Sequence, residues 1–434
     1  MIGDKEIILV PPGRYVVSNN IGSVLSASLG PCVGVGMVDK QRPVGGLAHV
    51  LIHHTQKIGL DDCIFGDEVV SVLTEEMERL GAKRESIIAG IAGGIILDTP
   101  WGNDLAVNTI ELIKENLKKL KIELAFIEPI EHLKYSFIVD VGLKTMGCMN
   151  LFEETVKDYE KKDIDEISIK EAIEKIKPIP HVISKVVTTI GQPYYNMSEI
   201  AEELKKDDVI VARLLKYCNS SVFSPKQKID SVEKAVIFLG SKNLLNVILR
   251  VYLMGFYRES AYELQPQGMY NHSLAVGMIS QKLCERLGMP QDVGFTCGLL
   301  HDIGKKVLDE LVKNNKKKYY EEVSKGRDSV DVEREMFKVD HCFLGTYLGK
   351  MWNFPDIILK VLEGHHRVSK DSEQMVKIVF LADILAHYIL PGIVVGMPSA
   401  KNFDQILKNI GLGHSDLVEI IQNLPITMFT NEEI

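Results

Sequence analysis

The sequence predicts two domains, a layered α/β domain at the N-terminus and an all-α helical domain behind it. Its 434 residues exceed one ordinary compact domain. Strand signals are confined to about the first 150 residues, and helical periodicity dominates from about residue 176. We place the domains at 1–150 and 176–390, with a charged linker or helix at 151–175 and a helical extension at 391–434.

The N-terminal part alternates strand and helix signals. Short β-rich runs bounded by turns with Gly or Pro fall at 7–10, 32–38, 47–52, 87–91, 123–127 and 136–141. Amphipathic helices are expected at 68–80, where Gly81 can cap the C-terminus, and at 106–120. Strands that alternate with helices favour a layered α/β fold.

After the N-terminal part, the sequence predicts a charged segment followed by a series of helices. Residues 152–175 are rich in Glu, Asp and Lys and contain no Gly or Pro, which is typical of a linker or a solvated helix. Helices are expected at about 181–190, 198–205, 208–218, 231–238, 241–255, 269–287 and 291–303, followed by others. Asn196 with Glu199, and Asp230 with Glu233, have the spacing of an N-cap and its acidic third residue.

Composition limits the class of protein. The chain is 46% hydrophobic and 25% charged, with a net charge of −9, which argues against bulk nucleic-acid binding. The seven cysteines are scattered, so they indicate neither a disulfide framework nor a zinc ribbon. No signal peptide and no membrane-length apolar run is apparent. We expect a cytoplasmic protein with no membrane span and no nucleic-acid partner.

One cysteine and one histidine could form a nucleophilic pair. Cys32 ends the stretch SASLGPC, which begins at Ser26, and His49 ends the stretch GGLAH. A thiolate assisted by an imidazole can attack a glutamine side-chain carbonyl, and a third group should orient the imidazole. Spacing alone is weak evidence, because a cysteine on a strand is also a small buried hydrophobe.

These motifs, together with MERLGA ending at Ala82 and the later Gly93-Gly94, resemble the chemoreceptor glutamine deamidase family, CheD. The resemblance implies that Cys32 is the nucleophile, that His49 is the general base, and that Ser26 stands where the family has Thr. It implies hydrolysis of glutamine amides to glutamate on the helices of methyl-accepting chemoreceptors, without a cofactor. A CheC-type phosphatase is an implied partner.

The chain departs from that family pattern in places that bear on substrate recognition. Pro31 replaces the usual Ser and removes a backbone N–H. The Gly-x-Arg-Asn region is reduced to LAVN, ending at Asn108, and LKY at 133–135 replaces a Gly-Arg element. A binding-only domain therefore remains an alternative. We expect His53 and His54 to lie in a surface loop and not to bind metal.

A second set of chemistry-bearing residues lies in the helical part: His272, His301, Asp302, His341, His365, His366 and Asp383. Imidazoles and carboxylates on separate helices can converge on a pair of metal ions, and a metal-bound hydroxide can attack a phosphodiester. LLHDIGK, at 299–305, resembles the HD superfamily of metal phosphohydrolases. Residues 176–390, with ARLLKYCNS at 212–220 and FLG at 238–240, resemble the HDOD signalling domain more narrowly.

This second resemblance leaves two functions open. It implies a divalent metal, iron or manganese, and a metal-dependent phosphodiesterase. Yet RVSK at 367–370 replaces the Gly-Tyr-Pro element of the phosphodiesterase relatives, and Gly268 offers no extra carboxylate. The alternative is a non-catalytic signalling scaffold. Lys305 could contact a phosphate or be an exposed helix-end lysine, and Arg213 and Asn219 are interpreted as structural.

Overall fold

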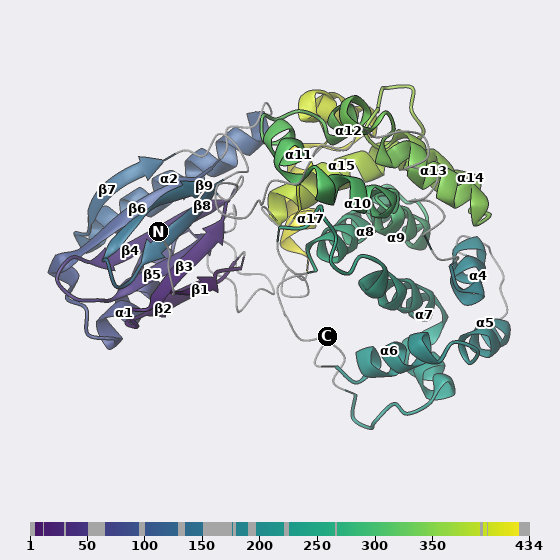
Figure 1. Cartoon of the computed structure of the whole chain (residues 1–434), viewed down its shortest axis with the longest axis horizontal. Helices are drawn as coiled ribbons and strands as arrows, with labels where there is room; N and C mark the ends of the chain where they lie inside the picture. The colour runs from purple at the N-terminus through teal and green to yellow at the C-terminus, as the bar shows by residue number, and fades with distance from the viewer. Residues whose placement is uncertain are drawn as a thin grey trace.

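The computed structural model describes residues 5–11, 13–29, 32–50, 66–94, 100–128, 135–150, 176, 179–189, 197–220, 225–264, 267–390, 394–396 and 398–424. The N-terminal part, with its sheets, lies at the left of Figure 1, and the helical part lies at the right. The predicted fold class, α/β followed by all-α, is confirmed. The predicted linker at 151–175 and both His53 and His54 lie outside the described residues.

Two sheets form the N-terminal part. The first has the order β1-β3-β8-β9, with β1 (Glu6–Leu9), β3 (Ser23–Ser28), β8 (Tyr135–Asp140) and β9 (Thr145–Asn150). The second has the order β2-β5-β4-β6-β7, with β2 (Tyr15–Ser18), β5 (Gly45–Val50), β4 (Val33–Asp39), β6 (Ile87–Gly93) and β7 (Glu123–Glu128). β1 with β3 and β6 with β7 are parallel, and the other pairs are antiparallel.

The N-terminal part has three layers, with the five-stranded sheet in the middle. One face of this sheet packs on the first sheet, where Phe137 and Val139 contact Leu47 and Val38. Its other face packs under α1 (Val69–Arg79) and α2 (Pro100–Leu120), which are separated by the short η1 (Arg84–Ser86) and β6. Every residue of β4 is buried, because both faces of this central strand are covered. β4 is therefore a rigid support for the residue that precedes it.

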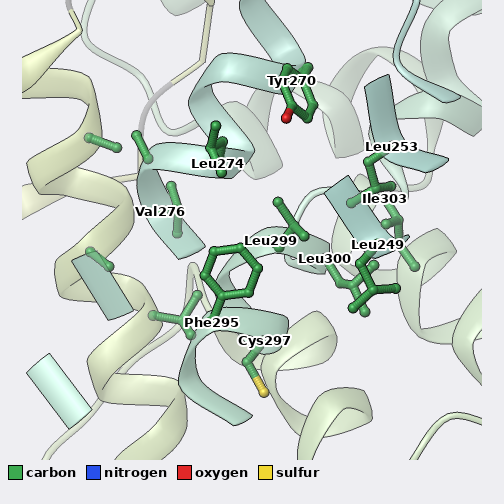
Figure 2. Packing of buried hydrophobic residues seen from close by; sticks show 14 of the residues in the cluster. Leu249, Leu253, Tyr270, Leu274, Val276, Phe295, Cys297, Leu299, Leu300 and Ile303 are labelled. Carbon is green, nitrogen blue, oxygen red and sulfur yellow. The ribbon is translucent and has the colours of Figure 1, made fainter. Parts of the chain in front are cut away.

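The helical part begins with α4 (His181–Thr189), α5 (Met197–Leu204), α6 (Asp208–Cys218) and α7 (Val232–Phe256). α8 (Gly268–Arg286), α9 (Gln291–Leu300) and α15 (Gln374–Ile389) pack together at its centre. Figure 2 shows Leu274 and Val276 of α8 beside Phe295 and Leu299 of α9. Around them lie α10 (Lys305–Asn314), α11 (Lys316–Val323), α12 (Ser329–Phe337), α13 (His341–Met351), α14 (Asp356–Gly364), η2 (Ala400–Asn402), α16 (Phe403–Asn409) and α17 (His414–Gln422).

Some local predictions need correction. The two helices expected at 231–238 and 241–255 are not among them, because α7 is interrupted between these ranges at Gly240, where φ is 69° and ψ is 170°. Ser231, not Asp230, is the N-cap of α7, because its side chain accepts from the Lys234 N–H. Asn196 lies outside the described residues, and Glu199 lies in the first turn of α5. Among the described helices, none combines the length and apolar character needed to cross a bilayer.

Candidate functional sites

Cys32 directly precedes β4, and His49 lies on the neighbouring strand β5. The register pairs Gly34 with His49. Since side chains alternate along a strand, Cys32, Gly34 and His49 lie on one face of the sheet, with Cys32 and His49 as diagonal neighbours. This face is turned toward the first sheet, since a Cβ on Gly34 would lie 2.8 Å from Cδ1 of Phe137. The structure thus brings together the two residues that the sequence proposed as nucleophile and base.

The Gly93-Gly94 pair fixes the backbone of Cys32. The Gly94 N–H donates to the Cys32 carbonyl at 3.0 Å. Gly93 has a φ of 95°, and a Cβ on it would lie 2.2 Å from the same carbonyl oxygen. Only glycine satisfies both the left-handed conformation and this close approach. The glycine pair noted in the sequence therefore holds the backbone of Cys32 in place.

The imidazole of His49 is held by a main-chain carbonyl. Its Nδ1 lies 3.2 Å from the Val10 carbonyl oxygen. The Val10 N–H donates in turn to the Ser26 carbonyl at 2.8 Å. Leu25 and Ala27 face the core between the sheets, so strand alternation turns the Ser26 side chain the other way. Ser26 is thus linked to His49 through the backbone of Val10, and the orienting role of its hydroxyl stays a prediction.

The environment of His49 keeps it neutral. Burial lowers the pKa of His49 to about 4, against a smaller opposing effect of the hydrogen bond to Val10. Because a carbonyl only accepts, Nδ1 carries the proton, and Nε2 keeps a lone pair. Nε2 is buried and has no hydrogen-bond partner among the described residues. An imidazole in this tautomer can accept a proton from a thiol.

The thiol of Cys32 meets the helical part. Its Sγ lies 3.7 Å from the carbonyl oxygen of Tyr388, near the end of α15, and Cys32 has no exposed surface. Cys32 belongs to the same apolar cluster as the helical core. The family departures at Pro31, Leu133 and Lys134 lie outside the described residues.

The predicted histidines and aspartates of the helical part form two adjoining groups. The members of each group offer ligand atoms within 4.8 Å of one another, and all are buried: His272, His301 and Asp383 in one group, and Asp302, His341, His365 and His366 in the other. Asp302 lies between the groups. Its Oδ2 is 3.2 Å from Nε2 of His301, and its Oδ1 is 3.3 Å from Nε2 of His341.

Surrounding acceptors aim these imidazoles inward. Nδ1 of His301 lies 2.7 Å from the Gly298 carbonyl, and Nδ1 of His365 lies 3.0 Å from the Val361 carbonyl. Carboxylates hold the other two rings: Glu333 lies 2.7 Å from Nδ1 of His341, and Asp328 lies 2.9 Å from Nδ1 of His366. Because Nδ1 of each ring is held by an outer acceptor, Nε2 of each ring is turned toward the centre of the site. Metal-binding histidines are commonly held in this way.

Charge in this cluster is strongly coupled. Burial opposes ionisation of Asp302, but the charges of His301 and Lys305 hold the pKa of this carboxyl well below its ordinary value. Lys305 is 1% exposed, and its Nζ lies 2.6 Å from Oδ2 of Asp302. The alternative of an exposed helix-end lysine is therefore wrong, because the first residue of α10 points into the core.

Sequence reasoning missed His387. It lies one turn after Asp383 on α15, with Nε2 3.6 Å from Oδ1 of Asp383 and its ring centroid 4.6 Å from that of His272. The spacing of four residues on one helix face was the available signal.

The donor set of the cluster fits a divalent transition metal. Nε2 of His272, His301 and His366 and Oδ1 of Asp302 are buried and make no well-oriented hydrogen bond among the described residues, although carboxylate and imidazole atoms approach one another within ion-pair distance. Imidazole and carboxylate groups left without partners in a buried site are the ligands that iron, manganese and zinc accept.

Both parts of the chain have counterparts among known proteins. Residues 176–368 match the family model of the HDOD domain. The chain is 35% identical over 124 residues to the chemoreceptor glutamine deamidase CheD of Thermotoga maritima, covering 28% of this chain and 75% of that protein. A probable CheD of Archaeoglobus fulgidus is 40% identical over 88 residues, which are 20% of this chain and 55% of that protein. A solved HDOD domain protein of unknown function from Geobacter sulfurreducens aligns with 61% of this chain and 93% of its own, at 22% identity and a TM-score of 0.43.

Fold and sites together define a two-domain protein that joins a layered α/β unit with a cysteine and histidine pair to a helical unit with a buried histidine and aspartate cluster. Through its N-terminal part the chain belongs to the CheD family, and its helical part carries an HDOD domain.

Proposed function

We propose that this chain is a protein-glutamine deamidase that uses Cys32 to convert glutamine side chains of chemoreceptors to glutamate. The observation that carries the proposal is the pairing of Gly34 with His49, which sets Cys32 and a neutral, carbonyl-anchored imidazole on one face of the sheet. The substrate class follows from the names of the CheD relatives.

The geometry supports a two-step reaction. Nε2 of His49 takes the proton of the Cys32 thiol as sulfur attacks the amide carbon, and the imidazolium returns that proton to the leaving nitrogen, which departs as ammonia. The acyl group is then a thioester on Cys32. Water, deprotonated by His49, attacks it, and the products are a glutamate side chain and the free thiol. The Val10 carbonyl keeps the imidazole in the required tautomer.

A mass-spectrometric assay on chemoreceptor fragments tests this proposal. Wild type should convert glutamine to glutamate, whereas Cys32→Ala and His49→Gln should lose at least 100-fold in rate. Cys148→Ala is the matched control, because Cys148 is a half-buried cysteine on β9 in the first sheet and not on the β4–β5 pair. Conversion that persists in Cys32→Ala, or its absence both in wild type and in a variant whose Cys32 is accessible to alkylation, would refute the proposal.

We propose in addition that the helical part binds divalent iron or manganese. The two buried groups that meet at Asp302 favour this. His272, His301 and Asp383 would hold one ion, and His341, His365 and His366 another, with Asp302 between them. A bound ion would supply Lewis acidity. Elemental analysis of purified wild type and His301→Ala tests the site, and equal metal content in both would contradict it.

A further inference from the structure

A cavity of about 440 Å³ opens between α6, α7 and α8, and Cys32 is not among its lining residues. It is lined by Arg213, Lys216, Tyr217, Val251, Met254, Gly255, Tyr257, Arg258, Glu259, Glu263, Gln267 and Tyr270. This volume lies in the range of small-molecule sites. Neither deamidation nor the metal groups make use of it.

Positive charge gathers on this cavity. Neither Arg213 nor Lys216 forms an ion pair among the described residues, and Arg258 meets Glu259 only at 3.9 Å. The guanidinium of Arg213 lies against the backbone of α7, since a Cβ on Gly255 would be 2.0 Å from its Nη1. Arginine in a fixed position offers a fork of N–H donors that matches phosphate oxygens.

Buried polar and aromatic groups complete the lining. Tyr270 is only 3% exposed, and its buried hydroxyl has no hydrogen-bond partner among the described residues. Figure 2 shows Tyr270 on α8 above Leu274. The rings of Tyr217 and Tyr257, with Val251 and Met254, form apolar walls. Burial raises the pKa of Glu263 to about 7, which reduces its repulsion of an anion at neutral pH.

We propose that this cavity binds an organic phosphate of mononucleotide size that carries an aromatic ring. Arg213 and Lys216 bind the phosphate, the Tyr270 hydroxyl donates to the ligand, and the tyrosine rings pack against its aromatic part. Arg213 is thus a ligand-binding residue, whereas the sequence favoured a structural role for it.

Calorimetry on the full chain tests this site with AMP, GMP, adenosine and inorganic phosphate as probes. A mononucleotide should bind at least 10-fold more tightly than either adenosine or phosphate alone, because both halves of the ligand are recognised. Arg213→Gln with Lys216→Gln should lower the mononucleotide affinity at least 10-fold, and Tyr270→Phe should lower it less. Lys234 is an exposed cation on α7 that pairs with Asp230, and Lys234→Gln should leave the mononucleotide affinity unchanged.

Two results would overturn the proposal. One is the absence of mononucleotide binding to wild type. The other is equal affinity in wild type and the Arg213→Gln and Lys216→Gln variant, provided that the circular dichroism of both is the same.

A separate observation concerns access to Cys32. The thiol has no exposed surface, it contacts the Tyr388 carbonyl at 3.7 Å, and it packs within the cluster of the helical core. A glutamine side chain on another protein must reach Sγ to react. We infer that the end of α15 closes the deamidase site in this conformation, and that separation of the two parts at Tyr388 opens it. This inference rests on the proposed function, but its test does not.

Alkylation of the native full chain by iodoacetamide, followed residue by residue by mass spectrometry, provides that test. Cys32 should react at least 10-fold more slowly in the native chain than in the urea-unfolded chain. Tyr388→Ala should raise the rate at Cys32 at least 10-fold, because it removes the buried side chain that holds the end of α15, with the Tyr388 carbonyl, in the apolar cluster around Cys32. Cys297, buried in α9, should stay protected in both proteins and so report that the helical part remains folded.

Fast labelling of Cys32 in wild type, or an unchanged rate in Tyr388→Ala, would overturn the closed-site inference. If Cys32 labelling rises while no glutamine is converted, the closure stands and the proposed deamidase function fails.

Discussion

The ammonium group of Lys305 lies 2.6 Å from Oδ2 of Asp302, and both side chains are buried among the histidines of the helical part. This internal cation neutralises the negative charge of Asp302, the carboxylate that lies between the two groups of histidines. If a metal ion binds beside Asp302 as proposed, the stability of the helical part should depend on metal.

Replacing Lys305 with Met should therefore destabilise the metal-free protein. Breaking a buried ion pair by removing one partner costs about 3–5 kcal/mol of unfolding free energy. Manganese should restore more stability in the variant than in wild type, since the ion takes over the neutralising role. Urea unfolding with and without the metal measures both effects.

Lys306→Met is the control for this change. Lys306 pairs with Asp309 and is a quarter exposed, so its loss should cost about 1 kcal/mol or less. Similar losses in the two variants would contradict the special role of the buried pair.

A matched pair of glycines separates backbone strain from steric contact at the cysteine. Gly93 and Gly81 have φ values of 95° and 96°, but a Cβ would touch the Cys32 carbonyl only at Gly93, and nothing within 4 Å at Gly81. Both alanine substitutions should cost about 1–3 kcal/mol from the left-handed conformation. Only Gly93→Ala should also lower the deamidation rate, by at least 10-fold. Equal rates in the two folded variants would show that Gly93 does not position Cys32.

The pKa of His49 predicts a pH dependence of stability. The unfolded histidine binds a proton near pH 6.5, whereas the folded one does so near pH 4. Between these values the unfolded state holds more protons, so unfolding free energy falls as pH falls from about 6.5 to 4. At pH 4.5 wild type should have lost about 2–3 kcal/mol relative to His49→Gln. Hydrogen exchange of β4 and β5 amides across this range measures the difference, and parallel pH profiles would contradict it.

Glu333 should control metal affinity without binding the ion. It accepts from the backbone N–H and Nδ1 of His341 at 2.8 and 2.7 Å, and from Tyr262 at 3.0 Å. Removing its charge in Glu333→Gln should weaken manganese binding about 10–100-fold. Glu335→Gln, an exposed partner of Arg327, is the control. Unchanged affinity in Glu333→Gln would place the ion elsewhere.

Most of the element order could be predicted from local patterns. The apolar periodicity of α1 and α8 and the β-rich run of β4 are properties of short stretches of chain. The strands β2, β3 and β9 were not predicted, because segments of four to six residues leave little pattern. The N-cap at Ser231 was missed in favour of Asp230, since neighbouring residues with similar side chains compete for one cap.

The sequence by itself determined which residues could do chemistry: Cys32 and His49 in one motif, and the histidines around His301 in another. Only the tertiary structure decided how they are held. The Val10 carbonyl beside His49 has no signature in the sequence, because any residue supplies a carbonyl and only the fold brings it near. The same holds for the Tyr388 carbonyl beside Cys32, 356 positions away, since contacts over such separations depend on packing and not on local sequence.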